Sequence, residues 1–294
     1  MTISVVQLEP VDYAAGLRIQ QKLVDLRKAD KIGDVLLLLE HTPVITLGRN
    51  AKAVNVLASP ELLAMRGVEV FECDRGGDVT FHGPGQPVGY PIFDLRGFGK
   101  SSRLSALSSQ ENSSQFPVPS SQNERLGPDA GSWLERRGTL GAVDYVRRLE
   151  EVLIRTCADF GIETERVSGL TGVWTKTESS KPQAKIAAIG VHISRAVTSH
   201  GFALNVNTDL SYFDLIVPCG ITAKPVTSMQ KELGREIQLG SVAESVSRNF
   251  GEVFGRKVAP APSLEALLGN TVGIPMKRPR ELREIHREEE SFLA

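Results

Sequence analysis

The sequence predicts an α+β fold, not a doubly wound parallel sheet. Its apolar segments arrive as runs of short strands with helices grouped around them, and strands and helices do not alternate strictly. The chain has 294 residues, of which 41% are hydrophobic, and it carries no internal repeat. This length suits one generous domain or two small ones.

The first third of the chain predicts one helix followed by strands. Apolar residues from Val11 to Val24 recur near helical spacing over 11–28, and Asp12 is available to the first turn. The remaining apolar stretches here are short and bounded by turn residues, which is typical of strands. They lie at 35–39, 44–47, 68–74 and 87–95.

The second half of the chain returns to the same pattern. Residues 140–162 form an amphipathic repeat that predicts the most regular helix of the protein. Its expected buried face carries Val143, Val146, Leu149, Val152, Leu153 and Cys157. Further strands are expected at 172–175, 185–193 and 201–207, and a last helix at 240–255.

Two segments differ in composition from the rest. Residues 99–138 are rich in Ser, Gln, Asn, Pro and Gly and lack periodicity, which predicts a disordered insertion. Residues 259–294 end in a run of charges, which predicts a frayed helix or solvated extension. We therefore expect one catalytic domain over 1–258, interrupted by the insertion.

Charge and hydropathy exclude several classes of function. The 34 Lys and Arg balance 35 Asp and Glu, so no overall field favours nucleic acid or an anionic membrane. No segment reaches the roughly 18 uninterrupted apolar residues of a membrane span, and the N-terminus lacks a signal-peptide pattern. These patterns predict a cytoplasmic protein.

The three cysteines are candidates of unequal quality. Cys219 stands between Pro218 and Gly220, where proline fixes the approach of the chain and glycine leaves the sulfur uncovered. It is a plausible nucleophile, although a lone cysteine is more often a small buried residue, and both interpretations stay open here. Cys73 and Cys157 lie on expected strand and helix positions and fit the buried interpretation better.

A nucleophilic thiol needs a neighbour that favours its thiolate. Lys185 opens the apolar run KIAAIGVHI, so its ammonium is expected at the mouth of a strand. At a separation of about 4 Å and an effective dielectric near 20, ammonium and thiolate attract by roughly 4 kcal/mol. Three histidines, His82, His192 and His200, are the other possible partners.

Residues 75–86 read RGGDVTFHGPGQ and raise a separate question. Four glycines beside a cation commonly indicate a phosphate loop, because bare backbone N–H groups can close on an anion. The segment lies between two expected strands, at the level of the sheet.

These stretches together resemble one family. The run RGGDVTFHGPGQPVGY, the segment from KIAAIGVHI to IVPCGI and the earlier LLLLEHTPVITLGR resemble the octanoyltransferase, or lipoate-protein ligase B, family. The first run matches the signature R-G-G-x-x-T-aromatic-H-x-x-G-Q at every fixed position. The likeness covers about 5–98 and 140–255. The Ser-rich insertion and the charged extension depart from it but touch no motif.

The resemblance implies a fold and a reaction. The fold is that of biotin and lipoate protein ligases, a mixed β-sheet flanked by helices. The reaction is an acyl transfer in which Cys219 takes an octanoyl or lipoyl group from acyl carrier protein, and Lys185 acts as general acid and base. The acceptor is one lysine of a lipoyl domain or of the glycine-cleavage H protein.

The resemblance also assigns the acyl-substrate site, in three segments. They are Arg75, Gly76, Gly77, Asp78, Val79, Thr80, Phe81 and His82; Ala188, Ile189 and Gly190; and Gly201, Phe202 and Ala203. Because one thioester exchanges for another at little cost in free energy, neither ATP nor a metal is expected, and the glycines have no phosphate to hold. Family members are often monomers.

Three alternatives to this function differ in what they require of the sequence. An ATP-dependent lipoate or biotin protein ligase of the same fold would keep the lysine but needs no cysteine at position 219. A non-catalytic binding module would tolerate loss of Cys219. A metal site of Cys219 with His82, His192 and His200 matches no compact ligand spacing.

The expected partner, acyl carrier protein, usually presents an acidic helix. We therefore expect a basic patch near the mouth of the pocket, for which Arg49 and Arg75 are candidates.

Overall fold

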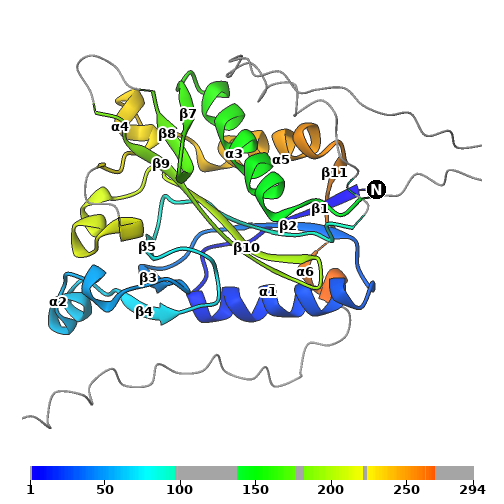
Figure 1. Ribbon diagram of the computed structural model, residues 1–294, viewed down its shortest axis with the longest axis horizontal. Helices are drawn as coiled ribbons and strands as arrows, with labels where there is room; N and C mark the ends of the chain where they lie inside the picture. The colour runs from blue at the N-terminus through cyan, green and yellow to red at the C-terminus, as the bar shows by residue number, and fades with distance from the viewer. Residues whose placement is uncertain are drawn as a thin grey trace, which may run out of the picture.

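The computed structural model describes residues 2–96, 98, 138–176, 182–220, 224–261 and 263–268. An eight-stranded sheet forms its centre and a three-stranded sheet lies beside it (Figure 1). The order of the large sheet is β11-β1-β2-β6-β10-β9-β8-β7. Strands β11, β1 and β2 are parallel to one another, and every pairing from β2 to β7 is antiparallel. The predicted α+β class with a mixed sheet is confirmed.

The strands of the large sheet are β1 (Thr2–Gln7), β2 (Asp34–Leu39), β6 (Val88–Ile92), β7 (Thr164–Val167), β8 (Leu170–Thr175), β9 (Lys185–Ser194), β10 (Val197–Leu204) and β11 (Lys257–Pro260). The small sheet holds β3 (Val44–Leu47), β4 (Glu69–Glu72) and β5 (Val79–His82). The α-helices are α1 (Tyr13–Lys28), α2 (Pro60–Met65), α3 (Ala142–Asp159), α4 (Met229–Leu233), α5 (Leu239–Phe254) and α6 (Leu264–Leu268).

Helices cover both faces of the large sheet. Successive side chains of a strand point to opposite faces, so alternate residues of β2 pack against helices on opposite sides of the sheet. Leu36 and Leu38 pack in the core beneath α3 and α5, whereas Leu37 packs in the core beneath α1. A strand buried on both faces has no polar positions, which explains its unbroken apolar run. A third core fills the small sheet, around Phe81.

The major predicted elements are confirmed, with shifts at their ends. The first helix begins at Tyr13 because the Asp12 carboxylate caps it, accepting a hydrogen bond from the Ala15 amide at 2.7 Å. The prediction that Val143 lies on the buried face of α3 is wrong. Its side chain is 72% exposed, and Tyr145 takes the buried position instead.

Several elements were not predicted. β5 runs through the middle of the glycine-rich segment, and β1, β7, β11 and the short helices were also absent from the prediction. β11 extends from Lys257 to Pro260 and so crosses residue 258, the expected end of the domain. Nearly all of the insertion 99–138 and most of 259–294 lie outside the described residues. Within the described part of the chain, no helix is long and apolar enough to cross a membrane.

Candidate active site

Cys219 occupies a strained turn. A short 3₁₀ segment, Pro218–Gly220, places Cys219 at φ 56° and ψ 19°, in the left-handed region that few non-glycine residues adopt. Such a conformation costs on the order of 1–3 kcal/mol and persists only where neighbouring structure enforces it. Here the Val217 amide donates to the Asn55 carbonyl at 2.7 Å, and the Gly220 amide donates to the Val217 carbonyl at 3.1 Å. The turn leaves the thiol half-buried.

Lys185 meets Cys219 at this turn. The Lys185 ammonium nitrogen, Nζ, lies 3.2 Å from the Cys219 sulfur, close enough to donate a hydrogen bond to it. The chain just after the turn explains how two residues 34 positions apart come together. The Lys185 amide donates to Pro225 O at 2.8 Å, and the Thr227 amide donates to Lys185 O at 2.9 Å. The segment that carries Cys219 is therefore tied to the start of β9.

Two residues of β8, Trp174 and Gly172, enclose the Lys185 side chain. Its Nζ lies 5.2 Å from the centroid of the Trp174 ring, within the range of a cation–π interaction. On the same strand, Gly172 has φ 119°, and a Cβ atom there would lie 2.7 Å from Lys185 Cε. Only glycine leaves the room that this side chain uses.

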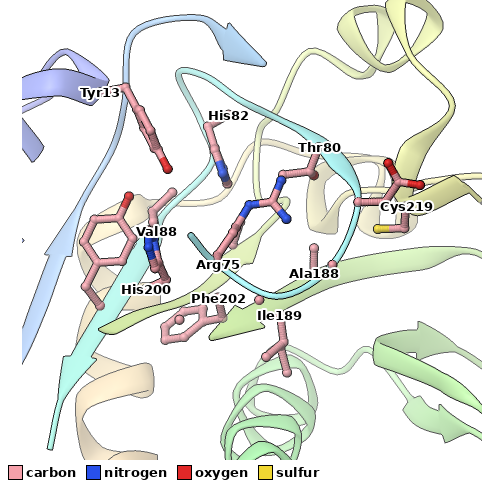
Figure 2. Close-up of a pocket in the computed structure, with 16 residues that line it drawn as sticks. Tyr13, Arg75, Thr80, His82, Val88, Ala188, Ile189, His200, Phe202 and Cys219 are labelled. Carbon is pink, nitrogen blue, oxygen red and sulfur yellow. The ribbon is translucent and has the colours of Figure 1, made fainter. Parts of the chain in front are cut away.

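A pocket opens from Cys219 between β5, β9 and β10 (Figure 2). The strand period of two divides β5: Thr80 and His82 face the pocket, while Val79 and Phe81 pack into the core of the small sheet. The predicted site residues that line the pocket are Arg75, Gly77, Asp78, Thr80, His82, Ala188, Ile189, Gly190, Gly201, Phe202, Ala203 and Cys219. Gly76, Val79 and Phe81 do not line it, and Lys185 borders a smaller cavity behind Cys219.

Four further residues line the pocket and were missing from the predicted site: Tyr13, Val88, Tyr90 and His200. Tyr13 begins α1, and Tyr90 lies in the middle of β6. In sequence both look like ordinary core aromatics, so no local signal marks them. His200 was noted as a possible partner, and its φ of 55° inside β10 is the structural mark of an unusual position.

Arg75 is buried, which corrects the expectation that it joins a surface patch. Only 8% of the residue is exposed, and its acceptors are the Thr46 carbonyl at 2.6 Å, the Thr46 hydroxyl and the Gly76 carbonyl at 3.1 Å. All three are neutral, and Arg75 forms no ion pair with any described residue. Arg49 does lie on the surface, where its guanidinium bonds His192 Nδ1 at 2.8 Å.

Burial sets the protonation of the groups opposite Cys219. It lowers the pKa of His82 to about 3 and that of His41 to about 4, and it also lowers the pKa of His200. Burial raises the pKa of the Tyr90 phenol well above its usual range. The pKa of Asp74 falls to about 2 because His200 donates a hydrogen bond to its carboxylate at 2.6 Å. Near neutral pH these three histidines and Tyr90 are therefore uncharged.

The other two cysteines lie away from the pocket lining. Cys157 is completely buried on α3, and burial raises the pKa of its thiol to about 12. Cys73 follows β4 instead of lying within a strand, and its thiol donates to the Leu47 carbonyl at 3.4 Å. Among the described residues, no group of three or more His, Cys, Asp or Glu side chains could hold a metal ion.

Comparison with solved structures identifies the fold. The fold matches a bipartite lipoate protein ligase from Thermoplasma acidophilum with a TM-score of 0.58 at 12% identity, covering 91% of both chains. It matches a lipoate-protein ligase A bound with ATP with a TM-score of 0.57 at 13% identity, covering 91% of this chain and 93% of that one. The protein therefore has the lipoate protein ligase fold.

Sequence comparison then gives the family. The profile described as lipoyl protein ligase A/B catalytic domain matches residues 12–109 and 132–251. An octanoyltransferase of Koribacter versatilis is 54% identical over 98% of both chains. One from Acidobacterium capsulatum is 52% identical over 88% of this chain and 92% of its own length. The chain belongs to the octanoyltransferase family and is an acyltransferase.

Proposed function

We propose that this enzyme transfers an octanoyl or lipoyl group from the phosphopantetheine thioester of acyl carrier protein to a lysine of a lipoyl domain or glycine-cleavage H protein. A thioester on Cys219 is the intermediate. The observation that carries the proposal is the 3.2 Å contact between Lys185 Nζ and Cys219 Sγ at the end of the pocket. An adjacent ammonium favours a thiolate, which is the nucleophilic form of cysteine.

In the first half-reaction the Cys219 thiolate attacks the thioester carbonyl. The bond from carbonyl carbon to pantetheine sulfur then breaks, and the departing sulfur takes the proton that Lys185 Nζ holds. The products are free pantetheine thiol, acylated Cys219 and a neutral Lys185. One thioester has replaced another, so the acyl group stays activated without ATP.

In the second half-reaction the neutral amine of the acceptor lysine attacks the acyl-Cys219 carbonyl. Lys185 takes the proton that the attacking nitrogen loses, and the bond to Cys219 Sγ breaks. The amide product leaves, and the ammonium–thiolate pair is restored. Lys185 thus serves as acid in one step and as base in the next.

A developing oxyanion needs N–H donors nearby. The amides of Gly76 and Gly220 are already engaged, donating to Val191 O at 3.0 Å and to Val217 O at 3.1 Å. Gly77 lines the pocket, and its amide has no acceptor within the described part of the chain. We assign Gly77 as the backbone donor to the oxyanion.

The test is intact-protein mass spectrometry after mixing the enzyme with octanoyl acyl carrier protein in the absence of ATP. We expect a hydroxylamine-labile octanoyl adduct that peptide mapping places on Cys219. Cys219→Ala and Cys219→Ser should abolish it. Cys157→Ala is the matched control and should retain it, since that thiol is buried outside the pocket lining.

Two results would contradict the mechanism. One is equal activity of the three cysteine variants. The other is no adduct without ATP, together with modification of a lipoyl domain once free octanoate and ATP are supplied. That second result would indicate an ATP-dependent ligase and leave Cys219 without a covalent role.

A further inference from the structure

Trp174 is a large buried side chain whose position ordinary packing does not explain. It is 1% exposed, yet it belongs to none of the three apolar cores. Its indole N–H is buried and has no acceptor among the described residues. A buried N–H without a partner is unfavourable, and a phenylalanine at this position would avoid it. The face of the ring, rather than its N–H, is then what tryptophan contributes here.

An irregularity in the ladder between β8 and β9 brings this ring to Lys185. Val173 pairs with Ala187. Trp174 then pairs with Lys185, which leaves Ile186 as an extra residue on β9. A bulge of this kind re-aims a side chain and is common beside active sites. Here it places Trp174 and Lys185 directly opposite each other, where cross-strand side chains meet.

The Lys185 ammonium has few other partners. Only 7% of the residue is exposed. Among the described residues, Nζ makes one hydrogen bond, to Cys219 Sγ at 3.2 Å, and no ion pair with a carboxylate. The centroid of the Trp174 ring lies 5.2 Å from Nζ, and tryptophan presents the best aromatic face for a cation. A buried charge needs compensation, and the ring adds to what the sulfur supplies.

The two contacts of Lys185 differ in when they are present. Before acylation the Cys219 thiolate holds the ammonium directly. Once the sulfur carries an acyl group, its negative charge is gone, whereas the ring remains. In the second half-reaction Lys185 takes the proton of the attacking amine, so it becomes positive while the sulfur has only begun to leave. An aromatic face beside Nζ stabilises that charge as it forms.

We propose that Trp174 is a positioning residue that holds the Lys185 ammonium beside Cys219 and acts mainly in the transfer from acyl-Cys219 to the acceptor amine. The inference rests on the proposed function, because it takes the proton-transfer role of Lys185 from it. Trp174 lines neither the pocket nor the smaller cavity behind Cys219, so it acts through Lys185 and not on the substrate.

Lys224 is the rival partner of the ring. Its Nζ lies 5.5 Å from the same centroid. It also donates to Gln183 Oε1, and Gln183 Nε2 donates to the Glu165 carboxylate at 2.6 Å. Lys224 thus has a polar partner of its own that is fixed in turn by a carboxylate. Because Lys185 has only the sulfur besides the ring, the observations favour Lys185 as the group that depends on Trp174.

The experiment measures the two half-reactions separately. The enzyme is acylated with octanoyl acyl carrier protein and then mixed with a lipoyl domain, and mass spectrometry follows acyl-Cys219 through each step. We expect Trp174→Leu to slow transfer roughly tenfold more than it slows acylation, because no ring face meets the forming charge. Trp174→Phe keeps an aromatic face and should hold the ratio of the two rates within about threefold of the wild-type ratio.

Two matched variants separate the ring face from packing and from its second neighbour. Phe93 is completely buried in the core beneath α3 and α5 and lines neither cavity, so Phe93→Leu should leave the ratio unchanged. Lys224→Met removes the rival cation and should also keep the wild-type ratio. Because the readout compares two steps of one enzyme, a general loss of stability does not imitate it.

A series of fluorinated tryptophans tests the ring face while its shape is nearly preserved. The chain contains two tryptophans, so a Trp133→Phe background leaves Trp174 as the one that is labelled. Each fluorine draws electron density from the ring face and weakens its attraction for a cation. The ratio of transfer rate to acylation rate should therefore fall stepwise with the number of fluorines. This series decides the question even if Trp174→Leu does not fold.

Three results would overturn the proposal. Trp174→Leu could slow both half-reactions alike, as a packing defect would. The fluorinated series could show a constant ratio. Lys224→Met could reproduce the loss seen in Trp174→Leu, which would make the ring a partner of Lys224. A wild type that forms no acyl-Cys219 would instead refute the proposed function, whereas a wild type that completes both steps leaves the variants to judge Trp174 alone.

Discussion

At the scale of single residues, the site combines a strained cysteine with a buried lysine, and the proposed mechanism gives the lysine a different task in each half-reaction. Thiolate formation needs a positive charge near the Cys219 sulfur. In the proposed mechanism the same group must then give its proton to the departing sulfur, so that it is neutral and can take a proton from the acceptor amine in the second half-reaction. Lysine meets both demands, whereas arginine meets only the first because it stays protonated in proteins.

This difference predicts distinct outcomes for two substitutions of Lys185. Lys185→Arg should still form acyl-Cys219, with the pantetheine sulfur leaving as a thiolate beside the guanidinium, but should transfer the acyl group to a lipoyl domain roughly 100-fold or more slowly, the usual worth of a general base. Lys185→Met should be slow in both half-reactions. Pulse acylation followed by chase with a lipoyl domain, read by mass spectrometry, separates the steps. Equal transfer rates for Lys185→Arg and the wild type would refute the proton-transfer role.

Local context makes each of these residues a candidate, and the family resemblance is what pairs them. The turn Pro218–Gly220 marks Cys219 as presented, and the apolar strand that follows Lys185 marks its ammonium as unusual. Neither feature shows that the two meet, since contacts with Pro225 and Thr227 arise only in the fold. Tyr13 and Tyr90 could not be predicted from the sequence, because only their neighbours in the fold distinguish these pocket residues from ordinary core aromatics.

At the scale of elements, the close contact between β8 and β9 predicts a role for Gly172. An added Cβ would lie 2.6 Å from Ala187 O and 2.7 Å from Lys185 Cε. Gly172→Ala should therefore displace the Lys185 side chain, and a shift of about 1 Å can cost roughly 100-fold in rate. The measurement is single-turnover acylation of Cys219.

Gly169→Ala is the matched control for this substitution. Gly169 also has a positive φ, at 77°, but a Cβ there meets nothing within 4 Å. Both variants place an alanine at a positive φ, and only Gly172→Ala also crowds the lysine. Similar acylation rates for the two variants would show that Gly172 serves the backbone alone.

Element prediction was strongest where periodicity is long and weakest where a strand is short. Helices α3 and α5 each repeat their apolar face over four turns or more, and both were found. β5 has only four residues, all buried, and the turn-forming sequences Gly-Gly and Gly-Pro-Gly lie close to its two ends. These turn residues made the whole segment look like a loop. Its pairing with β3 supplies the stability that its own sequence does not signal.

At the scale of the whole molecule, the buried neutral histidines in and beside the pocket make the free energy of unfolding depend on pH. His82 and His41 have pKa values lowered to about 3 and about 4, whereas an unfolded chain binds the proton near pH ~6.5. Below that pH the unfolded state holds more protons than the folded one. The free energy of unfolding therefore falls as pH falls, by about 1.4 kcal/mol per pH unit for each such histidine.

The pH window separates this effect from that of Asp74. The lowered pKa of Asp74, about 2, contributes stability that is fully present above its unfolded value near ~3.9 and is lost only in stronger acid. Urea unfolding between about pH 6.5 and about pH 4 thus reports the histidines. We expect His82→Gln to lower the slope against pH by about one proton, because it removes one buried titrating ring while His41 and His200 remain. An unchanged slope in that variant would mean that His82 binds its proton equally well in the folded pocket and in the unfolded chain.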